Sequence, residues 1–137
     1  MSSELDREAL IDIFVTEGSE AMAALTVALN PSDGSIPQPH KLQEQYVWAH
    51  KIRGASSLYG FNGLAMLGAL IENTLEQATS IDEGAWPKAV GVLRGMVEAF
   101  QHQLTAIQQG GGEDTATCEH WKSKVNEIGR ASCRERV

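Results

Sequence analysis

The sequence feature that most constrains the fold is a run of apolar residues that recur in alternating steps of four and three. Such spacing places them along one side of an α-helix, in a seam that resembles the heptad pattern of packed helices. The helix should begin between Asp82 and Pro87, because proline is tolerated only in the first helical turn. The run consists of Trp86, Val90, Leu93, Val97, Phe100, Leu104 and Ile107.

Apolar stripes of the same kind predict other helices, and no β-branched alternation persists anywhere. We expect Asp6 to cap the first helix, Asn62 the third, and Asp114 or Thr115 the last. A proline-rich linker at 30–39 separates the first two helices, whereas a short turn separates the second from the third. The predicted helices span about residues 7–29, 41–59, 62–78 and 114–128.

Short loops favour antiparallel neighbours, so the predicted fold is all-α, an antiparallel up-down four-helix bundle with an additional C-terminal helix. We expect one domain over 1–129, with its core at 5–108 and the extra helix at about 114–128. Residues 130–137 show no helical pattern in the sequence, and we expect them to be an appended tail or unstructured.

The net charge, the length of the apolar runs and the cysteine content argue against several classes of protein. A formal net charge of −7 over 137 residues argues against a nucleic-acid-binding surface. No apolar run approaches the roughly eighteen residues that a membrane span needs, and no basic-then-apolar leader opens the chain. Two cysteines far apart do not suggest a disulfide scaffold. The expected location is therefore the cytoplasm, without a membrane or nucleic-acid partner.

One histidine has unusual surroundings for a helix surface. His50 follows the buried-stripe position Ala49 by one residue, so it lies about 100° around the helix from that position, at the edge of solvent. Arg53, Gly54 and Ser57 stand three, four and seven residues later and share its face. A nucleophile beside a cation and a missing side chain suggests that His50 carries a phosphoryl group.

The turn between the second and third helices predicts a partner for this histidine. If the turn is centred on Phe61, Glu72 lies eleven positions after the centre and His50 eleven before it. A carboxylate at that height would accept the Nδ1 proton and leave Nε2 as the nucleophile. A register error of one or two residues would place Asn73 or Ala69 there instead.

The remaining candidates follow from the charge of a phosphohistidine. Because the modification adds nearly two negative charges, a nearby cation is needed, and Arg53 or Lys51 can supply it. Gly54 would let another protein approach closely, or would simply let two helices pack. Tyr46 and Ser57 could form the rim of a docking surface.

The other three histidines lack partners at metal-ligand spacing, and no metal site is expected at His40, His102 or His120.

The run Ala49-His50-Lys51-Ile52-Arg53-Gly54, with a further glycine at position 60, resembles the core motif of the histidine-containing phosphotransfer (HPt) domain family. Segments 70–76 and 14–20 are also similar to that family. The likeness covers about residues 5–108 and is strongest to the N-terminal phosphotransfer domain of chemotaxis-type histidine kinases. Where the family more often has lysine, this chain has Arg53.

The resemblance implies that His50 is phosphorylated, with Arg53 as the cation, Gly54 as the close-approach position and Glu72 as the supporting carboxylate. Such domains have no ATP site, bind no cofactor of their own and catalyse nothing alone. A histidine kinase domain supplies ATP, and a response-regulator receiver domain supplies the acceptor aspartate and Mg²⁺. If the natural protein is longer, this chain would be the phosphocarrier piece of a histidine kinase.

Two alternative functions are a non-catalytic interaction domain and an acid–base enzyme. A non-catalytic HPt-like interaction domain would be expected to have lost His50 or the cation at position 53, and both are present. An enzyme using His50 and Glu72 as an acid–base dyad would need a second nucleophile and a pocket-forming domain, for which the sequence offers no candidate.

Overall fold

The computed structural model describes residues 3–136 and the side chains within 6–129. Each predicted helix is present, and no strand occurs within the described residues. The helix of the long apolar stripe begins at Trp86, with Pro87 in its first turn as predicted. The elements are α1 (Ser3–Leu29), α2 (Pro39–Gln43), α3 (Tyr46–Leu58), α4 (Asn62–Glu76), a 3₁₀ turn (Ala78–Ser80), α5 (Trp86–Gln108) and α6 (Ala116–Arg136).

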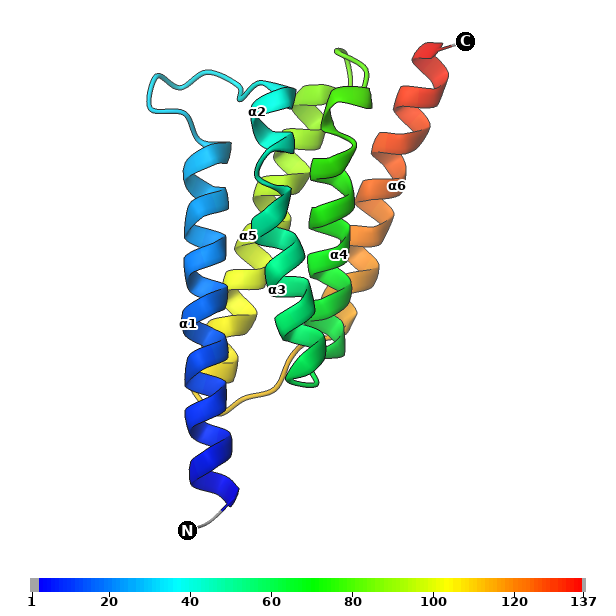
Figure 1. Cartoon of the computed structure of the whole chain (residues 1–137). Coiled ribbons are helices and arrows are strands. Elements are labelled where there is room, and N and C mark those ends of the chain that lie inside the picture. Colours follow the sequence, from blue (N-terminus) through cyan, green and yellow to red (C-terminus); the bar gives the residue numbers. More distant parts are fainter. Residues whose placement is uncertain (1–2, 137) are drawn as a thin grey trace.

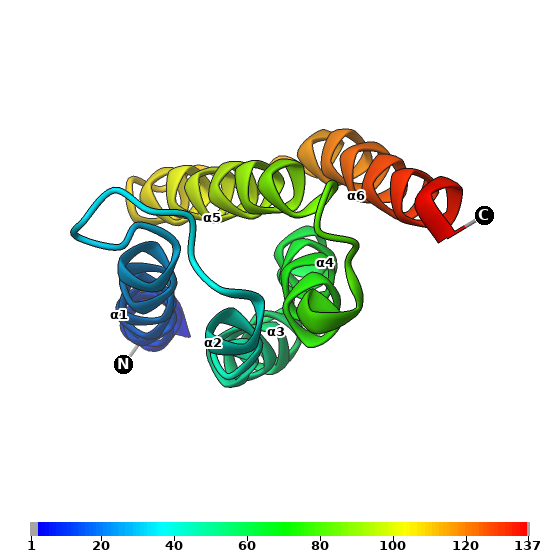
Figure 2. The same ribbon diagram turned by 90° about the horizontal axis from the view of Figure 1, so that it is seen from above.

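Four helices form the bundle, with each antiparallel to the one before it along the chain (Figure 1). Viewed from above, α1, α3, α4 and α5 surround a common interior, and α6 lies outside against α4 and α5 (Figure 2). The all-α bundle with an additional C-terminal helix is thereby confirmed. The short α2 sits at the start of α3, above the closely packed α3–α4 hairpin.

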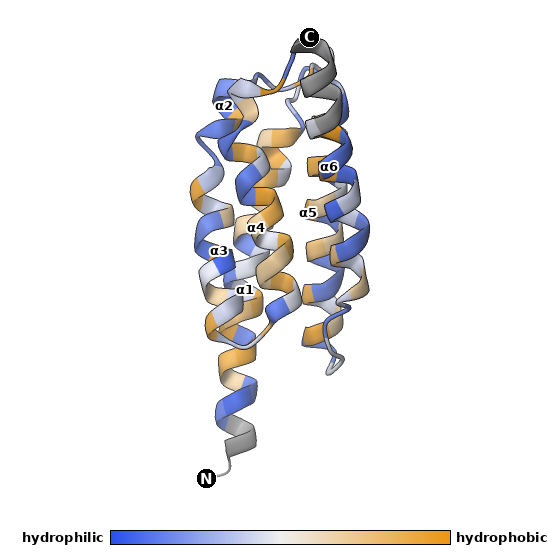
Figure 3. Cartoon of the chain, turned by 90° about the vertical axis from the view of Figure 1, so that its right-hand side faces the viewer, coloured by the Kyte–Doolittle hydropathy of each residue, from blue (hydrophilic) through white to orange (hydrophobic). Residues whose placement is uncertain are grey.

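The core is made by the inward stripes of these helices. All seven members of the α5 stripe are buried, as are Leu64, Leu67 and Ile71 of α4. Most hydrophobic residues lie on the inner sides of the helices, and most of the outer surface is hydrophilic (Figure 3). Each large aliphatic or aromatic side chain of this kind contributes about 1.5–3 kcal/mol through burial. The bundle therefore provides a rigid base for the surface of α3.

The predicted helix at 41–59 is divided in two. The α-helical hydrogen-bond pattern is interrupted between Gln43, where α2 ends, and Tyr46, where α3 begins. Two contacts fix the segment before the break: the Gln43 side-chain amide donates to the carbonyl of Glu76, and Trp86 Nε1 donates to the carbonyl of Pro37, both at 2.8 Å. Contacts between distant segments therefore override the local helical pattern.

Two predicted helix starts are wrong. The first helix begins at Ser3, so Asp6 lies inside α1 rather than at its cap. The start of α1 projects past the end of the bundle (Figure 1), and Leu10 in the first third of the helix is 48% exposed. Asn62 is the first residue of α4 and makes no capping bond. The Glu113 carboxylate accepts from the Leu64 N–H instead, at 2.9 Å.

The C-terminal helix is longer than predicted. Asp114 caps its start by accepting from the Ala116 N–H, as the sequence suggested, and the Trp121 ring fills the space left by Gly95 on α5. However, α6 continues to Arg136, so residues 130–136 are helical rather than unstructured. Alanine, arginine and glutamate in that stretch are good helix formers, and no proline interrupts it. Val137 lies outside the described residues, and the origin of 130–137 stays a prediction.

Cys118 illustrates how α6 is held on the bundle. Its side chain is buried, and its thiol donates to the carbonyl of Gly63 at 3.5 Å. Burial raises the pKa of the Cys118 thiol above its ordinary value, and the nearby carboxylates of Glu119 and Glu113 act in the same direction. The thiol is therefore a packing group with little reactive thiolate near neutral pH.

We expect native Cys118 to be alkylated by iodoacetamide at least about tenfold more slowly than the same thiol in urea at pH 8, because a raised pKa lowers the thiolate fraction. Mass spectrometry of a Cys133→Ser variant would measure the modification of Cys118 alone. Equal rates in the native and unfolded protein would show that α6 does not protect the thiol.

Candidate functional site

Helix α3 holds His50 at the border between the core and solvent. The neighbouring stripe residues Ala49 and Ile52 are buried, which fixes the rotation of the helix. The His50 side chain, one position beyond Ala49, remains 64% exposed. The imidazole is therefore carried on a rigid element while much of its surface is open to another molecule.

Glu72 of α4 lies directly against this histidine. Its side chain is only 4% exposed, and Oε2 is 2.6 Å from His50 Nδ1. The hairpin thus has the register that places Glu72 opposite His50, and neither Asn73 nor Ala69 takes that position. Asn73 is exposed, and Ala69 is partly buried.

The same carboxylate also binds Arg53. Nη1 of the guanidinium donates to Glu72 Oε1 at 2.5 Å, so each carboxylate oxygen has one partner. A buried carboxylate is costly unless it is paired and hydrogen-bonded, and Glu72 meets both conditions. The sequence predicted Arg53 only as a neighbour of the phosphoryl group, and did not reveal that it shares Glu72 with His50.

This pairing determines the state of the imidazole. An ionised carboxylate can only accept hydrogen bonds, so the contact with an ionised Glu72 assigns the proton to His50 Nδ1. The lone pair of the neutral ring then resides on Nε2. A histidine fixed in this tautomer is prepared to act as a nucleophile through Nε2 without first losing a proton.

Gly54 lies on the exposed face one turn after His50. A Cβ atom added at this position would meet no other atom of the described structure within 4 Å. Close packing of two helices in this chain therefore does not explain the glycine. That alternative applies to Gly68 of α4, which the sequence did not single out: a Cβ atom added there would lie 3.3 Å from Cα of Arg53.

A comparison with known protein families identifies a match that includes both His50 and Glu72. The family model of the Hpt domain matches residues 9–110, which is most of the chain. The chain belongs to the Hpt domain family. Membership implies histidine phosphotransfer in phosphorelay signalling, and Hpt domains typically interact with kinases and receiver domains. No curated protein matches the sequence closely enough to count as a relative.

The other predicted site residues of this Hpt domain lie on the exposed side of α3. Lys51, Ser57 and Tyr46 are all exposed, and the structure brings none of them to Glu72. Arg53 is therefore the cation that the fold places in the His50–Glu72 cluster. Its side chain is 45% exposed, which leaves guanidinium donors available to an incoming group.

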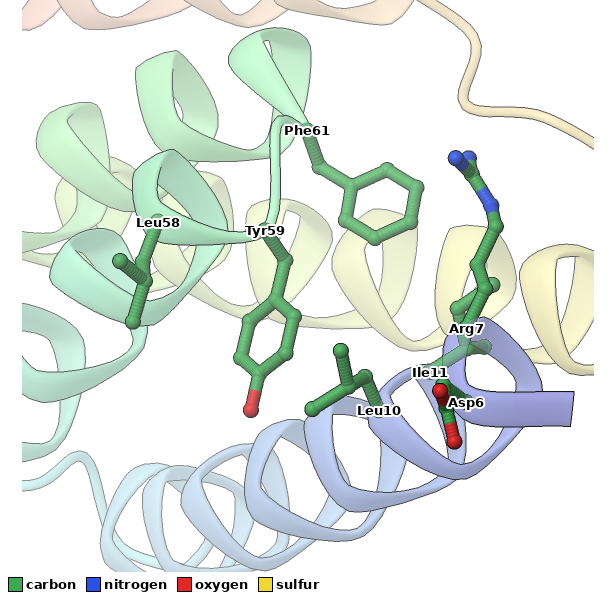
Figure 4. A pocket seen from close by; sticks show the side chains of 7 residues that line it. All are labelled: Asp6, Arg7, Leu10, Ile11, Leu58, Tyr59 and Phe61. Carbon is green, nitrogen blue, oxygen red and sulfur yellow. The ribbon is translucent and has the colours of Figure 1, made fainter. Parts of the chain in front are cut away.

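An apolar groove opens farther along the same hairpin, between the end of α3 and the projecting part of α1 (Figure 4). Its volume is about 460 Å³. Leu58, at its edge, is 83% exposed and stands two turns after His50 on α3. The groove is lined by Asp6, Arg7, Leu10, Ile11, Leu58, Tyr59 and Phe61.

The potential metal ligands of the described residues are scattered. No group of three or more histidine, cysteine, aspartate or glutamate side chains in this part of the chain could hold a metal ion. His40, His102 and His120 are exposed, at separate places. Within 3–136, no helix combines the length and the apolar character that crossing a bilayer requires.

Proposed function

We propose that His50 Nε2 is the atom that accepts and releases the phosphoryl group in this Hpt domain. The observation that carries the proposal is the contact between the exposed imidazole and the buried Glu72 carboxylate, 2.6 Å from Nδ1. A surface histidine with no assigned task would not need a buried, charged partner whose desolvation has to be offset.

The proposed reaction has two steps. In the first, the Nε2 lone pair attacks the γ-phosphorus of ATP held by a histidine kinase domain; the N–P bond forms and ADP leaves. Nδ1 keeps its proton, and Glu72 stabilises the positive charge that develops on the ring. In the second, an aspartate of a receiver domain attacks the phosphorus, the N–P bond breaks and neutral imidazole returns. Kinase and receiver domains supply ATP and Mg²⁺.

Arg53 would serve the phosphorylated state. The modification brings nearly two negative charges beside the Glu72 carboxylate, and repulsion between them would oppose it. A guanidinium already bound to Glu72 reduces that repulsion and can direct its remaining donors toward the phosphoryl oxygens. Lys51, the exposed residue directly after His50, would add a weaker, solvent-screened attraction.

The surface around His50 suits a visiting protein domain. Val47 and Leu58 are exposed apolar residues on the same side of α3, on either side of His50 and Gly54. A receiver domain that brings its aspartate to Nε2 would cover both, and the bare backbone at Gly54 would allow its loops to come close. Exposed apolar residues that lie close together are typical of surfaces that bind another protein.

We also propose a chemotaxis-type kinase as the signalling context and the cytoplasm as the location. The similarity of segments 14–20, 49–54 and 70–76 to the N-terminal domains of those kinases supports the first. The cytoplasmic location is supported by the need for phosphate derived from ATP and by Cys118, which is a free, buried thiol. The domain itself would then be a phosphocarrier without autonomous catalysis.

The test is phosphorylation by the catalytic domain of a chemotaxis-type histidine kinase with labelled ATP. We expect acid-labile, base-stable label on the protein, assigned to His50 by mass spectrometry, and its loss when a receiver domain and Mg²⁺ are added. Stable binding of either partner with no label at all would instead support the non-catalytic interaction domain.

Gly54 provides a separate prediction about docking. Gly54→Ala should keep the fold and stabilise α3 by about 1 kcal/mol, because the added methyl meets open space and alanine favours the helix. Gly54→Phe should also fold but slow transfer to a receiver domain by roughly tenfold or more, since the ring would hold the partner away from His50. Thermal melts and single-turnover transfer rates measure the two effects. Rapid transfer by Gly54→Phe would mean that partners do not approach over this position.

A further inference from the structure

We infer that Gly68 is a positioning residue for the phosphoryl-accepting histidine, because it sets the separation of α3 and α4 at which Glu72 reaches His50 and Arg53 together. Gly68 touches neither the imidazole nor any reacting atom. The inference rests on the proposed function only for its effect on rate; its effect on the state of the imidazole is independent of phosphorylation.

The contact at Gly68 is tight and involves backbone. A Cβ atom built there would lie 3.3 Å from both Cα and Cβ of Arg53 and 3.6 Å from its backbone nitrogen. Gly68 is itself buried. The neighbours of a new methyl group are therefore parts of α3 that cannot rotate away, and the helices would have to separate by a few tenths of an ångström.

The register connects this contact to the site. Gly68 stands four residues before Glu72, hence on the same face of α4 one turn away. Arg53 stands three residues after His50 on α3. In the antiparallel hairpin, the Arg53 backbone packs on Gly68 while its guanidinium extends to Glu72, which also binds His50. One turn of each helix thus contains the spacer and both hydrogen bonds.

Separation of the helices at Gly68 would lengthen those bonds. The Glu72 side chain is buried between the helices, and its oxygens lie at short distances from two partners on α3. A carboxylate that moves with α4 would lose contact with Nδ1 first, because the imidazole is largely solvated and can turn toward water. The fixed Nδ1–H tautomer would then give way to a mixture of both tautomers.

The experiment compares Gly68→Ala with Gly91→Ala. Gly91 is an exposed α5 residue whose added Cβ would meet nothing within 4 Å, so it controls for helix propensity alone. Nitrogen-15 NMR of the His50 ring should show the Nδ1–H tautomer in the parent and Gly91→Ala, and a shifted tautomer ratio in Gly68→Ala. Phosphorylation by the kinase domain should slow about three- to tenfold in Gly68→Ala only.

A double-variant comparison separates positioning from general loosening. In a Glu72→Ala background, Gly68→Ala should have no further effect on the tautomer ratio, because the group through which it acts is absent. If Gly68→Ala proves too unstable to study, sucrose can keep it folded for the same measurements.

Each result has a definite meaning. An unchanged His50 tautomer ratio and an unchanged phosphorylation rate in folded Gly68→Ala would overturn the inference. A full additional effect in the Glu72→Ala background would do the same. A third result is possible: neither the parent protein nor Gly68→Ala accepts label, but Gly68→Ala still shifts the tautomer ratio of His50. That result would reject the proposed function and leave the positioning role of Gly68 in place.

Discussion

Replacement of His50 by glutamine is expected to abolish phosphoryl uptake, reducing acid-labile label to background. The glutamine amide has nearly the reach of the imidazole and can still donate a hydrogen bond to Glu72, but it has no nitrogen lone pair able to attack phosphorus. The fold should survive, because the side chain is largely exposed and surface substitutions usually change stability by less than about 0.5 kcal/mol. Single-turnover labelling and a thermal melt measure the two effects.

His102→Gln is the matched control. His102 is an exposed histidine of α5, and the same chemical change there should leave labelling at the parental rate. Label that persists in His50→Gln at a comparable rate would mean that a different residue carries the phosphoryl group. Loss of label in both variants would point to impurity or misfolding rather than to a specific nucleophile.

The fold was predictable where burial alone determines structure. The α5 stripe fixes helix type and inward face, and all of its members are buried. The prediction failed where distant segments decide the local structure. Gln43 and Pro37 anchor α2 to other helices, which divides one predicted helix into two, and Glu113 replaces Asn62 at the start of α4. Such bonds join residues 33 to 49 positions apart, and periodicity carries no information about them.

The candidate site likewise has features that the sequence predicted and features that depend on contacts between distant segments. The opposition of His50 and Glu72 followed from counting outward from the turn, because an antiparallel hairpin places equidistant residues at one height. The sharing of Glu72 by Arg53 and the close contact at Gly68 depend on the distance between the helices. One signal was available: Gly68 is a small residue on the Glu72 face, one turn earlier.

Glu72→Ala should slow phosphorylation of His50 by about 10- to 100-fold, the size of effect that follows removal of a carboxylate orienting a metal-bound histidine. Without it, Nδ1 and Nε2 compete for the proton, and a ring protonated on Nε2 has no lone pair there. The ring also loses the negative charge that stabilises it as the N–P bond forms. Glu72→Gln should be intermediate, because an amide oxygen still accepts from Nδ1 but carries no charge.

The control for this change is Glu76→Ala, which removes an exposed carboxylate one turn later on α4 and should leave the rate unchanged. Loss of one member of a buried ion pair is usually very destabilising, yet here both partners of Glu72 are exposed enough to be hydrated. We therefore expect the free energy of unfolding to fall by less than about 2 kcal/mol, well below the usual cost of an orphaned buried charge. A large loss of stability with an unchanged rate per folded molecule would show that Glu72 holds the hairpin together rather than preparing His50 for transfer.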